Sequence, residues 1–168
     1  MKSKILIFGA VGGIGEALVH TLTADGWPLH LAGRDEAALK SLAGDVGATY
    51  SVCDVMDPAQ IKQAVLDAGD TLSGLVYAVG SILLKPLKAL TAEDFLDSFR
   101  LNAQGAALAV QAGEPALKAG EGAVVLFSTV AVRQGFKSHA AISAAKGAVE
   151  GLTVALAADL APKVRVNC

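Results

Sequence analysis

The chain has little of what marks metal-binding, disulfide-rich or nucleic-acid-binding proteins. Of its 168 residues only two are cysteine, Cys53 and Cys168, and neither they nor the three histidines have metal-ligand spacing. A net charge of −2 and the lack of any block of like charge give no basic footprint for nucleic acid. Two cysteines without such spacing fit a reducing compartment, so we expect a cytoplasmic protein without a metal and without a nucleic-acid partner.

Long apolar runs are also missing, although 53% of the residues are hydrophobic and only 18% are charged. No window of about 18 apolar residues escapes a charge. Even the stretch 140–162 carries Lys146, Glu150 and Asp159. The sequence therefore predicts no membrane partner. It also has no linker and no G-x-S-x-G hydrolase motif, and its length favours one domain over residues 1–168.

Short apolar, β-rich runs alternate with helical patterns along the whole chain. This alternation predicts an α/β fold with a buried parallel sheet, doubly wound, with helices on both faces. The predicted helices run from the glycine-rich turn to residue 25 and over 34–44, 57–69, 91–120 and 140–161, and the predicted strands cover 4–10, 28–33, 48–55, 72–80, 122–129 and 163–168. Asp57 before Pro58, and Thr91 with Asp94, are typical of helix N-termini.

A glycine-rich turn, "GAVGGIG" (residues 9–15), joins the first strand to the first helix. Glycines at this junction permit a tight turn and let backbone N–H groups approach a pyrophosphate at the helix N-terminus, as in Rossmann-like dinucleotide-binding domains. The alternative is that the glycines only let the helix and the strand pack closely. We expect cofactor contacts from Gly9, Val11, Gly13, Ile14 and Gly15.

The end of the second strand, "AGRD", bears on the choice of cofactor. A carboxylate here accepts hydrogen bonds from the ribose hydroxyls of NAD, whereas a guanidinium pairs with a 2′-phosphate. Arg34 therefore favours NADP(H), with NAD(H) still possible. Asp35 is the evidence against this preference, because its carboxylate could reach back to the ribose, although its position resembles a helix cap.

These motifs, in this order, resemble the short-chain dehydrogenase/reductase family along the whole chain. The segment "CDVMD" resembles the family's adenine-binding segment, which implies cofactor contacts from Asp54 and Val55. The segment "YAVG" stands where the family has Asn-Asn-Ala-Gly, which implies that Ala78 and Gly80 line the cofactor. Asn102 in "LNAQG" resembles the asparagine of the family's catalytic tetrad.

The other tetrad positions are only partly matched. Lys146 in "ISAAKGAVEGLT" stands at the family's lysine, which binds the nicotinamide ribose and lowers the pKa of a tyrosine one helical turn earlier. That tyrosine position holds Ile142, which has no proton to donate. The serine position holds Thr129, with Ser128 adjacent. His139, Ser143 and Tyr77 are the nearby candidates for a substitute acid.

The resemblance implies an oxidoreductase that transfers hydride between nicotinamide and a small carbonyl or alcohol substrate. Because of Ile142, an NADP(H)-binding protein with impaired catalysis, acting as a redox sensor or partner subunit, is the alternative. A third possible function is that of an epimerase-like relative, but that group also depends on the tyrosine, so Ile142 counts equally against it. The two long Ala-rich helices match helices that pair between subunits in this family, so the resemblance implies a homo-oligomer, a dimer or a tetramer. We also expect the domain to lack the C-terminal segment that forms the substrate lid.

Overall fold

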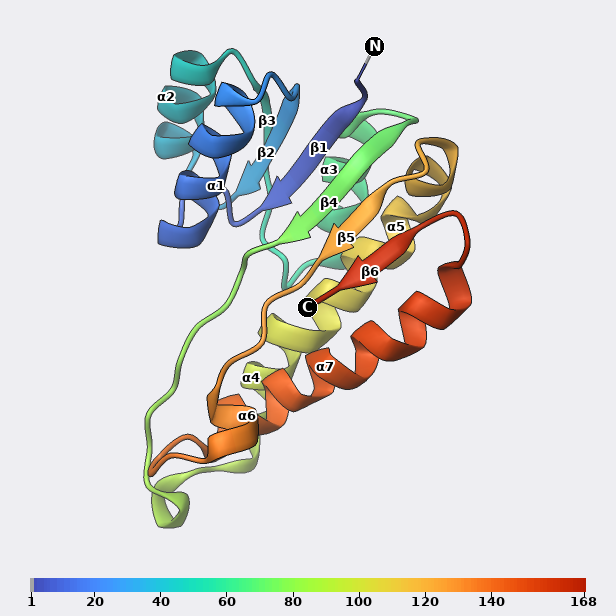
Figure 1. Cartoon of the computed structure of the whole chain (residues 1–168). Helices are drawn as coiled ribbons and strands as arrows, with labels where there is room; N and C mark the ends of the chain where they lie inside the picture. Colours follow the sequence, from blue (N-terminus) through green and yellow to red (C-terminus); the bar gives the residue numbers. More distant parts are fainter. Residues whose placement is uncertain (1) are drawn as a thin grey trace.

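The computed structural model describes residues 2–168, which form one six-stranded parallel sheet (Figure 1). Its strand order is β3-β2-β1-β4-β5-β6. The strands are β1 (Lys4–Phe8), β2 (Leu29–Gly33), β3 (Thr49–Val52), β4 (Leu72–Tyr77), β5 (Ala123–Val125) and β6 (Arg165–Asn167). The predicted doubly wound, Rossmann-like α/β fold is confirmed.

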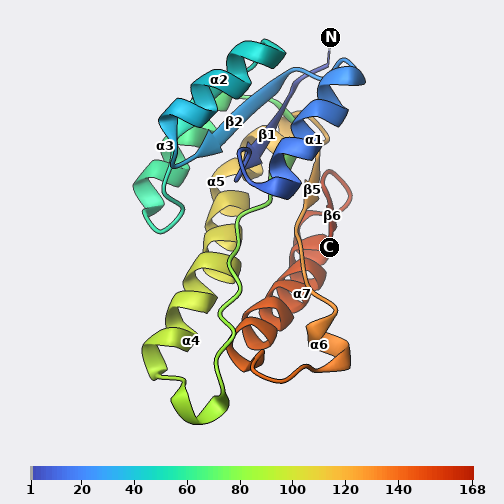
Figure 2. The ribbon, with the colours of Figure 1, turned by 90° about the vertical axis from the view of Figure 1, so that its left-hand side faces the viewer.

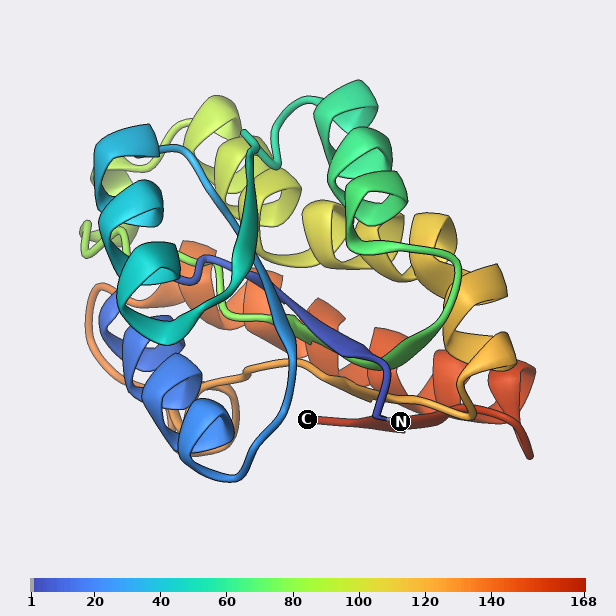
Figure 3. The ribbon, with the colours of Figure 1, turned by 90° about the horizontal axis from the view of Figure 1, so that it is seen from above.

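Helices cover both faces of the sheet, as Figure 3 shows from above. The apolar residues of α1 and α2 pack with those of β1 and β2 in one core cluster. The second cluster joins α3, α5 and α7 to β4, β5 and β6, and it also includes Leu6 and Phe8 of β1. The helices are α1 (Gly13–Ala24), α2 (Glu36–Val46), α3 (Pro58–Ala68), α4 (Ala92–Phe99), α5 (Gly105–Ala119), α6 (Ala131–Gln134) and α7 (Ala140–Leu160).

The order of the strands places a crevice beside the end of β1. From β1 the chain proceeds outward through β2 to β3, and then returns to the other side of β1 with β4. The last residue of β1, Phe8, is in register with Ala32 on one side and with Tyr77 on the other. In open parallel sheets ligands bind beyond the carboxyl ends of the strands at such a reversal point. The glycine turn, the end of β2 and the end of β4 all meet there.

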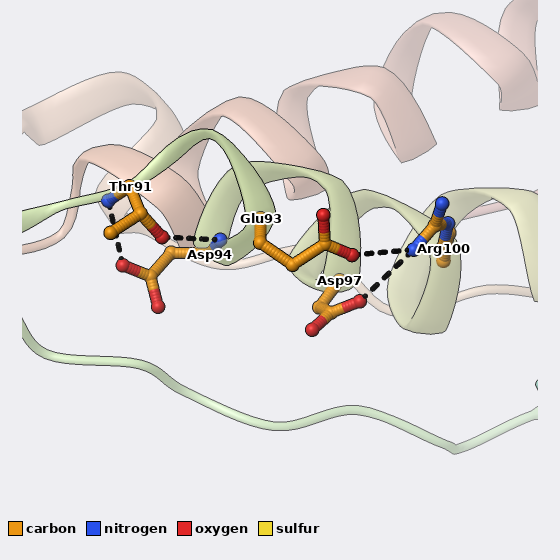
Figure 4. A network of polar contacts seen from close by, with 5 residues as sticks. All are labelled: Thr91, Glu93, Asp94, Asp97 and Arg100. Carbon is orange, nitrogen blue, oxygen red and sulfur yellow. Dashed lines mark hydrogen bonds and ion pairs between the residues drawn. The ribbon is translucent and has the colours of Figure 1, made fainter.

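The predicted helix caps are present. The Asp57 carboxylate accepts a hydrogen bond from the Ala59 N–H, with Pro58 in the first position of α3. Thr91 and Asp94 exchange both bonds of a capping box at the start of α4, and Figure 4 shows this box. Further along the same helix Arg100 pairs with Glu93 and Asp97 (Figure 4).

The predicted helix over residues 91–120 is interrupted. Between α4 and α5 lies the π-helical segment η2 (Arg100–Gln104), where the Leu101 carbonyl accepts a 2.7 Å hydrogen bond from the Tyr77 hydroxyl. A Cβ atom at Gly105 would collide with that hydroxyl. A local irregularity of this kind is frequent at functional sites, and here it carries Asn102.

The ladder of the fifth strand is shorter than predicted. It ends at Val125, after which only the Leu126 N–H still bonds to β6, at the Asn167 carbonyl. Residues 127–129 leave the sheet and lead into α6, a helix that the sequence pattern did not indicate. Figure 2 shows α6 at the same end of the molecule as the segment after β4, beyond the carboxyl ends of the strands. The main-chain N–H of Lys85 bonds the Ser138 carbonyl between these two segments.

By length and apolar composition α7 could cross a membrane. In this fold it packs against α4, η2 and β6, and its buried residues include Ala141, Ile142 and Val149. A core helix passes the same compositional test, so the expected lack of a membrane partner stays a prediction.

A buried polar network joins β2, β3 and α3 at one edge of the sheet. The two ring nitrogens of His30 lie 2.8 Å from the Thr49 hydroxyl and 2.9 Å from the Ser51 hydroxyl. Ser51 in turn donates to Asp67 on α3. Burial lowers the pKa of His30 to about 4, so the imidazole is neutral at physiological pH. The network ties β3 to β2 and to α3.

Candidate active site

Two adjoining pockets lie along the carboxyl ends of β1, β2 and β4. The first, of about 300 Å³, is lined by the glycine turn, the ends of β2 and β3, and residues 78–81. The second, of about 250 Å³, is lined by the same residues 78–81, residues 127–129 and α7. Because residues 78–81 line both pockets, the two pockets form one continuous surface along the strand ends.

The glycine turn owes its shape to two of its glycines. Gly9 has a φ of +79°, and a Cβ there would lie 2.9 Å from the Ala78 carbonyl carbon. A Cβ at Gly15 would collide with the carbonyl oxygen of Gly9. Gly13, by contrast, has open space around it, and Val11 and Ile14 line the pockets. Gly15 thus serves the turn by close packing, while Gly9 and Val11 also border the first pocket.

At the end of β2 the two charged residues have different roles. The Asp35 carboxylate accepts a 3.0 Å hydrogen bond from the Ala38 N–H, so it caps α2 as its position suggested. Arg34 lines the first pocket and is exposed, and among residues 2–168 no salt bridge engages its guanidinium. The exposed cation therefore remains free to pair with an anion in the pocket.

Asp54 and Val55 stand on the opposite wall of the first pocket, after β3. One Asp54 carboxylate oxygen accepts from the Met56 N–H at 3.0 Å, and the Asp54 N–H donates to Gln60. Cys53 lines the same wall, and burial raises the pKa of its thiol to about 11. The thiol is therefore neutral and acts as an apolar surface.

The second pocket brings together most of the predicted catalytic positions. Ser128, Thr129, Ile142 and Lys146 all line it. The Lys146 ammonium donates a 2.8 Å hydrogen bond to the Phe127 carbonyl, and burial lowers the pKa of this amine. Ile142 lies one helical turn before Lys146 and is 2% exposed. An apolar side chain thus occupies the wall where the family resemblance implies a phenol.

Asn102 approaches this pocket from η2. Its amide nitrogen donates to the Ser98 carbonyl at 2.9 Å, while its side-chain oxygen is buried without a hydrogen-bond partner among residues 2–168. That oxygen lies 2.9 Å, and the Lys146 nitrogen 3.4 Å, from where a Cβ of Gly80 would stand. Gly80 is therefore the residue whose lack of a side chain lets Asn102 and Lys146 reach the same wall. A buried, unpaired acceptor beside a cation fits a ligand or water that donates a hydrogen bond there.

Three candidate proton donors from the sequence lie elsewhere. Tyr77 is 2% exposed, and burial raises the pKa of its hydroxyl, which bonds the Leu101 carbonyl. Ser143 donates to the Ala131 carbonyl, and His139 bonds the Lys137 carbonyl and packs on Phe136. In the described part of the chain, residues 2–168, none of these three residues lines the second pocket.

The sequence patterns missed Glu150. Its carboxylate accepts a 2.7 Å hydrogen bond from the Ser128 hydroxyl, and Arg133 lies 4.0 Å from it. The signal that could have found it is its spacing of four residues after Lys146, which puts both residues on one side of α7. Thr129 differs from Ser128, because its hydroxyl oxygen accepts only a 3.3 Å bond from the Ala131 N–H and keeps its proton available.

The residues present fit a nicotinamide dinucleotide. The turn between β1 and α1 offers backbone N–H groups without bulky side chains in front of them. Arg34 supplies a cation at the first pocket and Lys146 at the second. Asp54, after β3, supplies a hydrogen-bond acceptor at the first pocket. Among residues 2–168 no cluster of His, Cys, Asp and Glu could hold a metal ion.

Comparison with known proteins agrees with this geometry. A family model described as enoyl-(acyl carrier protein) reductase matches residues 9–168. The L-2,3-butanediol dehydrogenase of Corynebacterium glutamicum is 31% identical over 97% of this chain and 68% of its own length. The D-threitol dehydrogenase of Mycolicibacterium smegmatis is 34% identical over 96% of this chain and 66% of its own length.

Solved structures share the fold. A variant of the actinorhodin polyketide ketoreductase with NADPH superposes with a TM-score of 0.92 at 26% identity, covering 99% of this chain and 68% of that one. This chain spans about two thirds of the length of the curated relatives it matches. The sequence match, the strand order and the arrangement of the two pockets show that the chain belongs to the short-chain dehydrogenase/reductase family.

Proposed function

We propose that this chain binds NADP(H) and transfers hydride between nicotinamide and a small carbonyl or alcohol substrate. The observation that supports this most is the convergence of most of the predicted cofactor positions, and of three of the four tetrad positions, on two adjoining pockets. The relatives named as dehydrogenases act on small diols and polyols by name, which suggests substrates of similar size.

The chain's own residues divide the work of binding and polarisation. The amide groups at the start of α1 would hold the pyrophosphate, Asp54 and Val55 would border the adenine, and Lys146 would hold the ribose next to the nicotinamide. Reduced nicotinamide, when bound, supplies the hydride. The Thr129 hydroxyl donates a hydrogen bond to the substrate oxygen and polarises the carbonyl, because its own acceptor contact leaves its proton free.

We propose that NADP(H) is preferred over NAD(H) because the two charged residues after β2 make different contacts. Asp35 is held as the cap of α2, so it does not compete for the ribose hydroxyls. The exposed Arg34 guanidinium can form a charge-assisted pair with a 2′-phosphate.

Replacing Arg34 by alanine is expected to weaken NADPH binding by about tenfold or more, because charge-assisted hydrogen bonds to the phosphate are lost. NADH binding should stay within about twofold, since NADH has no 2′-phosphate. Fluorescence titration of both cofactors measures the effect, with Arg165→Ala at the start of β6 as a control for the loss of one positive charge. Equal losses for NADPH and NADH would contradict the assignment.

A second candidate function is an NADP(H)-binding protein that no longer catalyses hydride transfer. Ile142 favours it, because the buried isoleucine occupies the position of the family's proton donor. The two functions separate in one experiment: NADPH affinity and NADPH oxidation are measured on the same protein with a panel of ketones, aldehydes and quinones. Binding with substrate-dependent oxidation supports the oxidoreductase, and binding without oxidation supports the sensor or partner subunit.

We also propose that copies of the chain pair, as a dimer or tetramer, through α4, η2 and α7. Leu96 and Phe99 on α4 are 46% and 47% exposed, and they border an apolar groove that Leu152 of α7 also lines. Analytical ultracentrifugation of the protein and of Phe99→Glu tests this pairing. A cytoplasmic location remains part of the same proposal.

A further inference from the structure

We propose that Lys146 itself supplies the proton during carbonyl reduction, in place of the missing tyrosine. The inference rests on the proposed oxidoreductase function and assigns its proton donor. In the short-chain dehydrogenase/reductase family this lysine binds the ribose and lowers the pKa of the tyrosine hydroxyl. Direct proton transfer from Lys146 to the substrate is therefore a new assignment for this chain.

The first argument is the composition of the second pocket. Of the residues that line it in the described chain, Lys146 alone has a side chain that titrates. The alternatives named above point away, since Tyr77, Ser143 and His139 all hydrogen-bond to main-chain carbonyls outside the pocket. Among the described residues, the side-chain protons that this pocket offers to a substrate oxygen are therefore those of Lys146 and of the hydroxyl groups.

The second argument is the state of the ammonium group. An ammonium has three N–H donors, and one of them bonds the Phe127 carbonyl at 2.8 Å. No carboxylate forms a salt bridge with Lys146 among residues 2–168. Two N–H donors of Lys146 therefore remain for a ligand. One helical turn earlier the pocket is lined by the apolar side chain of Ile142, whereas a phenol at that position would accept one of these hydrogen bonds.

The charged groups around Lys146 are compatible with proton release. Glu150, one turn later on α7, is engaged by the Ser128 hydroxyl. From η2, Asn102 presents a neutral amide oxygen. The charge of Cys168 at the end of β6 raises the pKa of Lys146, but burial outweighs it and lowers that pKa overall. Lys146 is half-buried, and an amine with a lowered pKa gives up its proton more readily than an ordinary lysine.

Glu150 is the weaker candidate for the same step. Its carboxylate accepts a hydrogen bond from the Ser128 hydroxyl, so that hydroxyl is directed toward Glu150. A carboxylate oxygen that accepts this bond has no proton to give to a substrate. Its reach into the pocket is also indirect, through Ser128.

The step balances as follows. A hydride, with its electron pair, passes from a reduced nicotinamide dinucleotide to the carbonyl carbon. The carbonyl π pair moves to oxygen, and that oxygen takes a proton from the Lys146 nitrogen, directly or through one water. The products are the alcohol, the oxidised dinucleotide and a neutral amine, which takes a proton from solvent before the next turnover.

Lys146→Arg is the decisive variant. Arginine keeps a positive charge and hydrogen-bond donors for ribose, but it does not deprotonate in proteins. We expect NADPH affinity to stay within about tenfold, while kcat for carbonyl reduction falls by about 10² to 10⁴-fold, the usual contribution of proton transfer. In the unaltered protein kcat should fall at alkaline pH as the ammonium deprotonates, and this limb should be absent from the residual rate of Lys146→Arg. Lys163→Arg, at an exposed position before β6, is the matched control.

A readout without turnover accompanies these rates. The rate at which acetic anhydride modifies Lys146, followed by mass spectrometry against pH, should give a pKa below the ordinary range of a lysine amine. An ordinary titration of Lys146, an unchanged kcat in Lys146→Arg, or an alkaline limb that disappears in Glu150→Gln instead would each overturn the proposal. NADPH binding without any turnover in the unaltered protein would overturn it together with the oxidoreductase function, whereas unchanged kcat in Lys146→Arg would leave that function standing.

Discussion

Replacing Ile142 by tyrosine is expected to raise the rate of NADPH-dependent carbonyl reduction by up to about 10² to 10⁴-fold, the range that a positioned general acid contributes. The new phenol would stand one helical turn before Lys146 and opposite Thr129, on the wall of the second pocket. The nearby ammonium would lower the pKa of the phenol and so ease its loss of a proton. Steady-state kcat with a carbonyl panel measures the gain.

Ile142→Phe is the matched control for this prediction, because phenylalanine has the bulk of tyrosine without its hydroxyl. Its kcat should not exceed that of the unaltered protein. If both variants gain equally, the effect comes from the shape of the pocket and not from the proton. If only Ile142→Tyr turns over, the unaltered chain is the binding protein of the second candidate function. If the unaltered protein and Ile142→Tyr are equally fast, the acid already present is sufficient.

Replacing Gly15 by alanine is expected to lower the free energy of unfolding by about 3 kcal/mol or more and to abolish measurable NADPH binding. A Cβ at this position would collide with the carbonyl oxygen of Gly9. Overpacking ordinarily costs about 1 to 3 kcal/mol when side chains can shift. Here both partners are main chain, so relief requires the turn and the N-terminus of α1 to move apart. Urea denaturation and cofactor titration measure the two effects.

Gly13→Ala is the control within the same turn. No atom lies within 4 Å of a Cβ at Gly13, so the free energy of unfolding should be unchanged or up to about 1 kcal/mol higher, because alanine favours helix over glycine. An equal loss of stability in both variants would show that the turn is sensitive to any side chain, and would contradict the specific role of Gly15.

Several features of the fold and the site follow from local chemistry and were predictable from the sequence. Asp57 before Pro58, and Thr91 with Asp94, form the predicted caps because a cap needs only residues within three positions of each other. The apolar runs form the predicted parallel sheet because strands buried on both faces must be apolar throughout. Asp35 caps α2 for the same local reason.

Other features depend on contacts between distant segments. The helix predicted over residues 91–120 changes from α-helical to π-helical at η2, where the Tyr77 hydroxyl of β4 donates a hydrogen bond to the Leu101 carbonyl. Helical periodicity does not contain that contact. The same holds for Gly80, whose missing side chain matters only because Asn102 and Lys146 both approach it in space.

The sequence by itself determined the fold class and the glycine turn, since both follow from residue identity and short-range spacing. Together with the family resemblance, it also determined that Ile142 stands where the family has its tyrosine. Only the tertiary structure decided which groups could replace the tyrosine. The sequence offered three substitute acids, Tyr77, His139 and Ser143. Each of their side chains instead forms a hydrogen bond with a main-chain carbonyl outside the second pocket. The direction of a side chain and its hydrogen-bond partners are set by packing between elements, and that packing leaves Lys146 as the titratable group of the pocket.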